Sequence, residues 1–182
     1  MKKTFNTKNI VITALLIAFG IIIPTAFGFL RVILPPAFTA TLTAHVPIFV
    51  AMFISPMSAL FTAIGTAIGF QFSGLDMVVV VRAASHVLFA AAGAYMIKKN
   101  VSVVFTGLVT AILHALLEAL VVYAFLVLGW TQAKEGTTFE TIAFYVTGIG
   151  TLIHHIIDYV IAILIVKALA KAGNFVKMPK IF

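Results

Sequence analysis

Residues 10–24 read IVITALLIAFGIIIP and contain no charged side chain. Apolar residues fall on every face of this stretch, and the same holds for MVVVV at residues 77–81. A strand of a transmembrane barrel would instead alternate apolar and polar positions. Runs of this kind predict helices that cross a lipid bilayer, because a helix satisfies its backbone hydrogen bonds within its own segment.

The composition of the whole chain agrees with these runs. The 182 residues are 63% hydrophobic and 9% charged, whereas soluble domains are about 45–50% apolar and about 25% charged. A water-soluble fold of this size could not bury so much apolar surface. The composition therefore excludes a soluble enzyme, a disordered tail and a nucleic-acid-binding module.

The length of the chain limits the number of membrane spans. A membrane-crossing helix needs roughly 20 mainly apolar residues, so six such helices use about 120 residues. Four helices would leave apolar sequence unplaced, and eight would leave almost no loops. We therefore predict an all-α integral membrane protein, with residues 1–182 forming one domain of six transmembrane helices in a single bundle. The predicted helices cover about 9–30, 44–55, 57–73, 78–97, 101–128 and 142–170.

The second predicted helix is short for a full span, so we expect it to be tilted or incomplete. Between Arg31 and Asp76 there is no Lys, Arg or carboxylate. This region accommodates two helices that are joined tightly at Ser55 and Pro56, because proline fits the first turn of a helix.

The distribution of the basic residues predicts the orientation in the membrane. The formal net charge is +7, and cytoplasmic loops of membrane proteins are enriched in Lys and Arg. With both termini in the cytoplasm, nine of the twelve Lys and Arg residues lie on that side, Arg31 and Lys134 lie outside, and Arg82 lies within the membrane. The external connections are then 29–43, 72–77 and 129–141. Two of them are long, which indicates that something enters from outside.

Polar residues recur inside the predicted spans, where an ionisable side chain costs about 2.5–3.5 kcal/mol on insertion scales. Residues three or four positions apart share one helix face. Such stripes are Arg82 and His86 in the fourth helix, Thr110, His114 and Glu118 in the fifth, and Thr147, Thr151, His154 and Asp158 in the sixth, with His155 beside them. The stripes predict a shared wet cavity that starts near the external face. Arg82 is placed to hold a carboxylate ligand there through two parallel hydrogen bonds.

A purely structural interpretation of these residues stays open at the level of sequence. Arg82 can pair with Glu118 in a salt bridge, and the histidines can link helices through hydrogen bonds to Glu118 and Asp158. His45, at the start of the second predicted helix, fits an interfacial position as well as a ligand contact.

Enzyme motifs are absent from the chain. It contains no phosphate loop of the form G-x-x-x-x-G-K-[ST], no H-E-x-x-H motif and no cysteine. We therefore expect a protein that is not an enzyme, with no catalytic residue, no cofactor and no bound metal. Two alternatives stay open. One is a small intramembrane metalloenzyme, with His114 and Glu118, and His154 and Asp158, as ligands; the other is a stand-alone proton-coupled carrier.

The chain resembles the S component of energy-coupling factor (ECF) vitamin transporters. The resemblance rests on six helices in about 180 residues, basic cytoplasmic ends, a long first external loop and the motif A-x-x-x-A at Ala14 to Ala18 in the first helix. It extends over nearly the whole chain. The residues of the polar stripes occupy the helices that line the ligand pocket in this family.

The resemblance implies a substrate-binding subunit in a bacterial cell membrane that captures a vitamin from outside and has no ATPase of its own. It would dock on a transmembrane energy-coupling subunit that carries two cytoplasmic ATPases, with Ala14 and Ala18 facing the coupling subunit. The ligand pocket would lie among the fourth to sixth helices under the external loops. The expected substrate-binding residues are Arg82, His86, Glu118, His45, Thr147, Thr151 and His154.

The identity of the vitamin is argued from the chemistry of these residues. Arg82 favours an anion, and Glu118 and the threonines can receive hydroxyl or amide groups. Pantothenate combines a carboxylate, an amide and hydroxyls and is our first expectation. Niacin fits the arginine and nearby aromatic residues, and a pyrimidine or folate is a further alternative.

Overall fold

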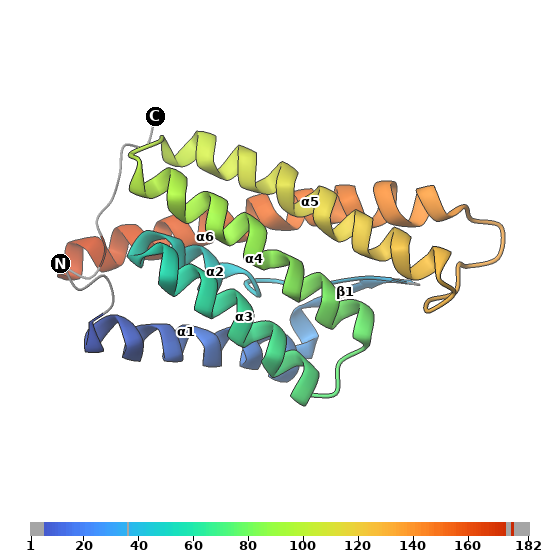
Figure 1. Ribbon diagram of the computed structural model, residues 1–182, viewed down its shortest axis with the longest axis horizontal. Helices are drawn as coiled ribbons and strands as arrows, with labels where there is room; N and C mark the ends of the chain where they lie inside the picture. Colours follow the sequence, from blue (N-terminus) through green and yellow to red (C-terminus); the bar gives the residue numbers. More distant parts are fainter. Residues whose placement is uncertain (1–5, 36, 174–175, 177–182) are drawn as a thin grey trace.

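The computed structural model describes residues 6–35, 37–173 and 176. It is an all-α bundle with one small hairpin (Figure 1). The helices are α1 (Thr7–Ala26), α2 (Val46–Ile54), α3 (Pro56–Phe72), α4 (Met77–Lys98), α5 (Val103–Val127) and α6 (Gly150–Ala172), with a 3-10 turn η1 (Gly28–Leu30) and a π-helix η2 (Thr141–Ile149) that runs directly into α6. The all-α prediction is confirmed.

Among the described residues, four helical segments are long and apolar enough to cross a membrane. They are Thr7–Ala26, Met77–Lys98, Val103–Val127 and Thr141–Ala172. Helix α3 has 17 residues and α2 has nine. At 1.5 Å per residue, α2 spans only about 14 Å, so it is the incomplete helix that we expected. The number of six complete crossings stays a prediction.

The bundle turns its polar residues inward and its apolar residues outward. Helix α5 presents Leu108, Ile112, Leu116 and Leu120, each 51–58% exposed, along one face, whereas Glu118 on the opposite side is 3% exposed. A soluble helix would show the reverse pattern. This arrangement suits a surface that is covered by lipid.

The short helix α2 lies at the centre of the bundle. All its residues from Val46 to Phe53 are buried, and it packs against α1, α3, α4 and α6. The link to α3 is the predicted tight one: the Ser55 hydroxyl accepts a hydrogen bond from the backbone N–H of Ser58 at 3.0 Å. Pro56 opens the first turn of α3, where its missing N–H costs nothing.

The first external connection differs from the expected loop. Helix α1 ends at Ala26 rather than near residue 30, and strands β1 (Arg31–Leu34) and β2 (Phe38–Thr41) form an antiparallel hairpin with Arg31 opposite Thr41. The Arg31 guanidinium donates to the carbonyl of Pro24 in the last turn of α1, and a basic side chain at this position stabilises a helix end. The β-branched residues that follow favour a strand.

The helix ends and the connections between helices lie at the two ends of the bundle. The start of α1, the end of α6 and the α4–α5 connection lie at one end, and the α5–α6 connection lies at the other (Figure 1). This placement agrees with the start of α1 and the end of α6 lying on one side of the membrane. Which side that is stays a prediction.

Candidate functional site

A cavity of about 120 Å³ lies beneath the hairpin. Its roof is the chain from Thr39 to His45, and its walls come mainly from α3 and α4. Helix α5 contributes Glu118 and α6 contributes His154. The first external connection thus covers the cavity as expected, but α3 forms a wall in place of much of the expected contribution from α5 and α6.

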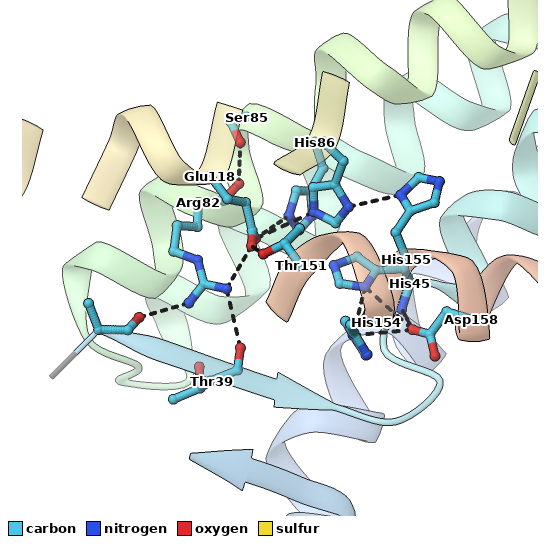
Figure 2. A network of polar contacts seen from close by, with 12 residues as sticks. Thr39, His45, Arg82, Ser85, His86, Glu118, Thr151, His154, His155 and Asp158 are labelled. Atoms are coloured by element: carbon cyan, nitrogen blue, oxygen red, sulfur yellow. Dashed lines mark hydrogen bonds and ion pairs between the residues drawn. The ribbon is translucent and has the colours of Figure 1, made fainter. Parts of the chain in front are cut away.

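Arg82 connects the hairpin to the interior of the bundle (Figure 2). Its side chain donates to the carbonyl oxygens of Ala37 at 3.0 Å and Thr39 at 3.2 Å, and to Glu118 Oε2 at 2.7 Å. The side chain of Phe38 lies 5.6 Å below the guanidinium, within the range of a cation–π contact. Arg82 is 4% exposed, and its Nε has no hydrogen-bond partner among the described residues. The salt bridge with Glu118 that the sequence left open is therefore present, and three of the five N–H donors are used, which leaves two.

Glu118 on α5 has polar partners on two other helices, α4 and α6, and on its own helix. Its Oε2 accepts from Arg82 and from Thr151 Oγ1, the latter at 2.5 Å. Its Oε1 lies 3.1 Å from His86 Nε2 and 3.4 Å from His114 Nε2. A buried carboxylate needs such partners to offset its lost hydration, so α4, α5 and α6 are held together at this one side chain.

Asp158 plays a similar part at the base of the roof. Its carboxylate accepts the backbone N–H of Thr43 at 2.8 Å and that of His45 at 3.0 Å. Thr43 has φ of +70°, a left-handed conformation that a non-glycine residue adopts only when its surroundings hold it there. Asp158 thereby fixes the turn that delivers His45 from β2 into the bundle.

All five histidines of the chain lie in one buried group. The rings of His45, His86 and His114 lie edge to face with centroids 4.6–4.7 Å apart. His45 Nδ1 shares a 3.0 Å hydrogen bond with His154 Nε2 and lies 3.4 Å from Asp158 Oδ2. His114 Nδ1 shares one of 3.0 Å with His155 Nδ1. Figure 2 shows this network.

The residues expected to bind substrate separate into two groups. Arg82, His86, Glu118, His45 and His154 line the cavity. Thr151 reaches only Glu118, and Thr147 is fully buried away from the cavity lining with no partner for its hydroxyl among the described residues. The expected polar stripe on the sixth predicted helix is present, but the cavity lies on the side of Glu118 away from these two threonines.

Sequence reasoning missed the contribution of α3 and the hairpin. Thr66 and Phe70 line the cavity from α3, and Arg31, Thr39 and Thr41 line it from the hairpin. Thr62 and Thr66 on α3 are buried at a spacing of four residues, a weak polar stripe among small residues that could have indicated this wall. The backbone of the hairpin carries no comparable signal.

The histidine cluster has the geometry of a cation site. One ligand atom from each of His45, His86, His114 and Glu118 falls within a group whose members all lie within 4.8 Å of one another, and His45, His154 and Asp158 form a second such group. Imidazole nitrogen and carboxylate oxygen are common ligands of Zn²⁺ and related ions.

The motif residues of α1 lie far from the cavity. Ala14 and Ala18 are exposed on one face of α1, and Ala14 borders a shallow apolar groove with Ile17 and Phe61. Next to this groove α1 packs on α3, where Ile17 fills the space above Gly65. The glycines of α3 therefore serve close helix packing, as their spacing indicated.

Comparison with known proteins identifies a relative of this chain. The chain is 36% identical over 177 residues to the niacin transporter NiaX of Lactococcus lactis subsp. cremoris (strain MG1363). The alignment covers 93% of this chain and 78% of that protein. No protein-family model and no solved structure matches the chain.

Proposed function

Because the chain belongs to the same family as the niacin transporter NiaX, and is accordingly a multi-pass membrane transport protein rather than an enzyme, we propose that it binds niacin, as nicotinate, and carries it into a bacterial cell. It acts as the substrate-binding S component of an ECF-type importer in the plasma membrane. A transmembrane coupling subunit and two cytoplasmic ATPases supply the energy, since the chain contains no phosphate loop for ATP hydrolysis.

The size of the cavity favours niacin over pantothenate. Pockets for drug-sized molecules measure about 300–1,000 Å³, and this cavity holds about 120 Å³. A single aromatic ring with one carboxylate suits such a space, whereas the branched chain of pantothenate and the fused rings of folate need a larger one. Pantothenate, our first expectation from the sequence, has no support from the relative and becomes the comparison ligand.

The observation that carries the proposal is the buried guanidinium at the cavity wall. Arg82 has an unused Nε–H donor, and an arginine–carboxylate hydrogen bond is charge-assisted and strong in a water-poor site. The ring of nicotinate packs against the apolar lining at Ile48, Phe70 and Val79. The hairpin above is held in place by the same arginine, so the ligand site and its roof share one residue.

Calorimetry on the purified full chain in detergent tests the proposal. We expect nicotinate to bind, nicotinamide to bind at least about 100-fold more weakly because a neutral amide makes no charge-assisted hydrogen bond with Arg82, and pantothenate to bind weakly or not at all. Arg82→Lys keeps the charge but loses the planar fork, and it should abolish binding. Tight binding of pantothenate but not nicotinate would overturn the ligand assignment.

A further inference from the structure

We propose that His45, His86, His114 and Glu118 bind a divalent transition-metal ion of the zinc class at the inner end of the cavity. The sequence led us to expect no metal, because these residues are scattered over 74 positions and match no metal-binding motif. The fold brings them together from the roof, α4 and α5, each as a buried residue.

The spacing of the ligand atoms fits an ion of this size. Bonds of about 2.0–2.2 Å in a tetrahedral site place neighbouring ligand atoms about 3.3 Å apart. Glu118 Oε1 lies 3.1 Å from His86 Nε2 and 3.4 Å from His114 Nε2. The three imidazole rings lie edge to face with one another, with all three centroid distances between 4.6 and 4.7 Å, and one nitrogen of each lies within 4.8 Å of a Glu118 carboxylate oxygen.

One ligand atom has no other role. His114 is fully buried, and its Nε2 makes no hydrogen bond with any described residue. A buried polar atom without a partner carries a free-energy cost. A metal ion bound by both His114 Nε2 and Glu118 Oε1 would remove this cost.

Two of the three histidine ligands, His45 and His114, have the outer partners that a metal site requires. Metal-binding histidines usually hold their second nitrogen in a hydrogen bond, which fixes the tautomer and aims the first nitrogen at the ion. The Nδ1 of His45 faces Asp158 and His154, and the Nδ1 of His114 faces His155. In each ring, Nε2 is therefore the atom left for the ion.

The carboxylate ligand is oriented in the same way. Glu118 Oε2 is held by Arg82 and Thr151, which turns Oε1 toward the histidines. Solvent access exists as well, because His45, His86 and Glu118 line the cavity. An ion can reach the site by the route that the ligand uses.

The charge of the site gives the ion a role in anion binding, a step that rests on the proposed function. Two carboxylates, Asp76 and Glu118, line the cavity with two guanidiniums, Arg31 and Arg82, and a third carboxylate, Asp158, lies behind the lining, 3.4 Å from His45 Nδ1. With neutral imidazoles, the formal charge is one negative, which repels nicotinate. A divalent ion reverses the sign, so metal and nicotinate should bind cooperatively.

The direct test uses the full chain purified without a polyhistidine tag, stripped with a chelator and titrated with Co²⁺. We expect one Co²⁺ per chain, the intense visible absorption of a tetrahedral site, and loss of that absorption when Zn²⁺ is added. Wild-type protein that binds no ion, or binds several with only the weak spectrum of octahedral Co²⁺, would overturn the proposal, whatever the variants do.

Matched variants locate the ion. Glu118→Gln and His114→Gln should weaken Co²⁺ binding by about 100-fold or more, since even outer partners of a ligand are worth about 10–100-fold. Glu135→Gln makes the same change at an exposed carboxylate outside the cavity lining and should leave Co²⁺ affinity unchanged. A larger loss in His154→Gln than in His114→Gln would move the ion to the group of His45, His154 and Asp158, against the proposal.

Nicotinate calorimetry with and without Zn²⁺ separates this inference from the proposed function. Zn²⁺ should tighten nicotinate binding within the range of about 5- to 150-fold that is usual for coupled sites. Nicotinate affinity that is independent of Zn²⁺ would refute the coupling. If no nicotinate binds in either condition while one Co²⁺ still binds per chain, the proposed function fails and the metal site stands.

Discussion

Arg82 has two roles that separate residues usually fill. It donates to two carbonyl groups of the hairpin and to a carboxylate of α5, so it holds a covering element onto the bundle. It also lines the cavity, and two of its five N–H groups make no hydrogen bond with the described residues. An arginine can do both because its five N–H donors lie in a fixed plane, whereas a lysine offers one point charge.

The pairing of Arg82 with Glu118 leads to a prediction about stability. Removal of one partner leaves the other charge buried and unpaired, so Arg82→Met and Glu118→Leu should each lower the free energy of unfolding by about 3–5 kcal/mol. The double variant buries no unpaired charge, and its cost should fall short of the sum of the single costs by about 0.5–3 kcal/mol. Reversible denaturant unfolding in mixed micelles measures all three values.

Arg31 provides the control for this cycle. It lies at the same cavity but donates to the carbonyl of Pro24 rather than to Glu118. Arg31→Met combined with Glu118→Leu should therefore be additive. Additivity in the Arg82 cycle as well would mean that the salt bridge contributes nothing specific.

Among the elements, the long helices were predictable from the sequence and the hairpin was not. The predicted spans 78–97 and 101–128 differ from α4 and α5 by two residues or fewer at each end, because a continuous apolar run admits only a helix in lipid. The residues of the hairpin lie between spans, where the same rule does not apply. Its position depends on distant partners, namely Arg82 for β2 and Asp158 for the following turn.

The candidate site was predictable in its residues but only partly in its position. Stripes on three helices identified Arg82, His86, Glu118 and His154, since charge inside a membrane needs a partner. The stripes could not show that the cavity opens toward α3, whose lining is formed by small and aromatic side chains. Neither could they show that His45 reaches His86 and His114, a contact that depends on the path of the roof.

The packing of α1 on α3 is a second feature of this scale, and it yields a prediction. A Cβ at Gly65 would lie 2.7 Å from Ile17 Cδ1 and 2.9 Å from two further Ile17 carbons, so rotation of Ile17 about one bond cannot relieve the clash. Gly65→Leu should destabilise the chain by about 1–3 kcal/mol through overpacking, despite the better helix propensity of leucine. The thermal midpoint in detergent measures the loss.

Gly28 is the matched control for this change. It lies after the end of α1, and a Cβ there would meet nothing within 4 Å. Gly28→Leu should leave the midpoint unchanged. An equal midpoint for Gly65→Leu and wild type would show that α1 moves away from α3 without cost.

At the scale of the whole molecule, α1 is the least enclosed of the helices long enough to cross a membrane. Only 17% of its most apolar window is buried, compared with 39–50% for the other three. It packs mainly on α3 along one side, which leaves the face with Ala14 and Ala18 open. A smooth face of small residues permits close approach of a partner helix within the bilayer.

The cavity and the exposed face of α1 are separate parts of the molecule, so a substitution on α1 can impair transport without impairing ligand binding. Ala14→Trp adds a large side chain at the face proposed to contact the coupling subunit, remote from the cavity, so nicotinate affinity in calorimetry should equal that of wild type. Uptake of labelled nicotinate into liposomes that contain the coupling subunit, both ATPases and ATP should be lost, because the bulky ring keeps the helices apart. Leu15→Trp, at the neighbouring exposed position on α1, controls for the size of the ring and should retain more uptake.

A last measurement separates the S component from a stand-alone proton-coupled carrier. Liposomes that contain the wild-type chain alone should accumulate no nicotinate, with or without a proton gradient. Accumulation of nicotinate in these liposomes would favour the carrier over the S component.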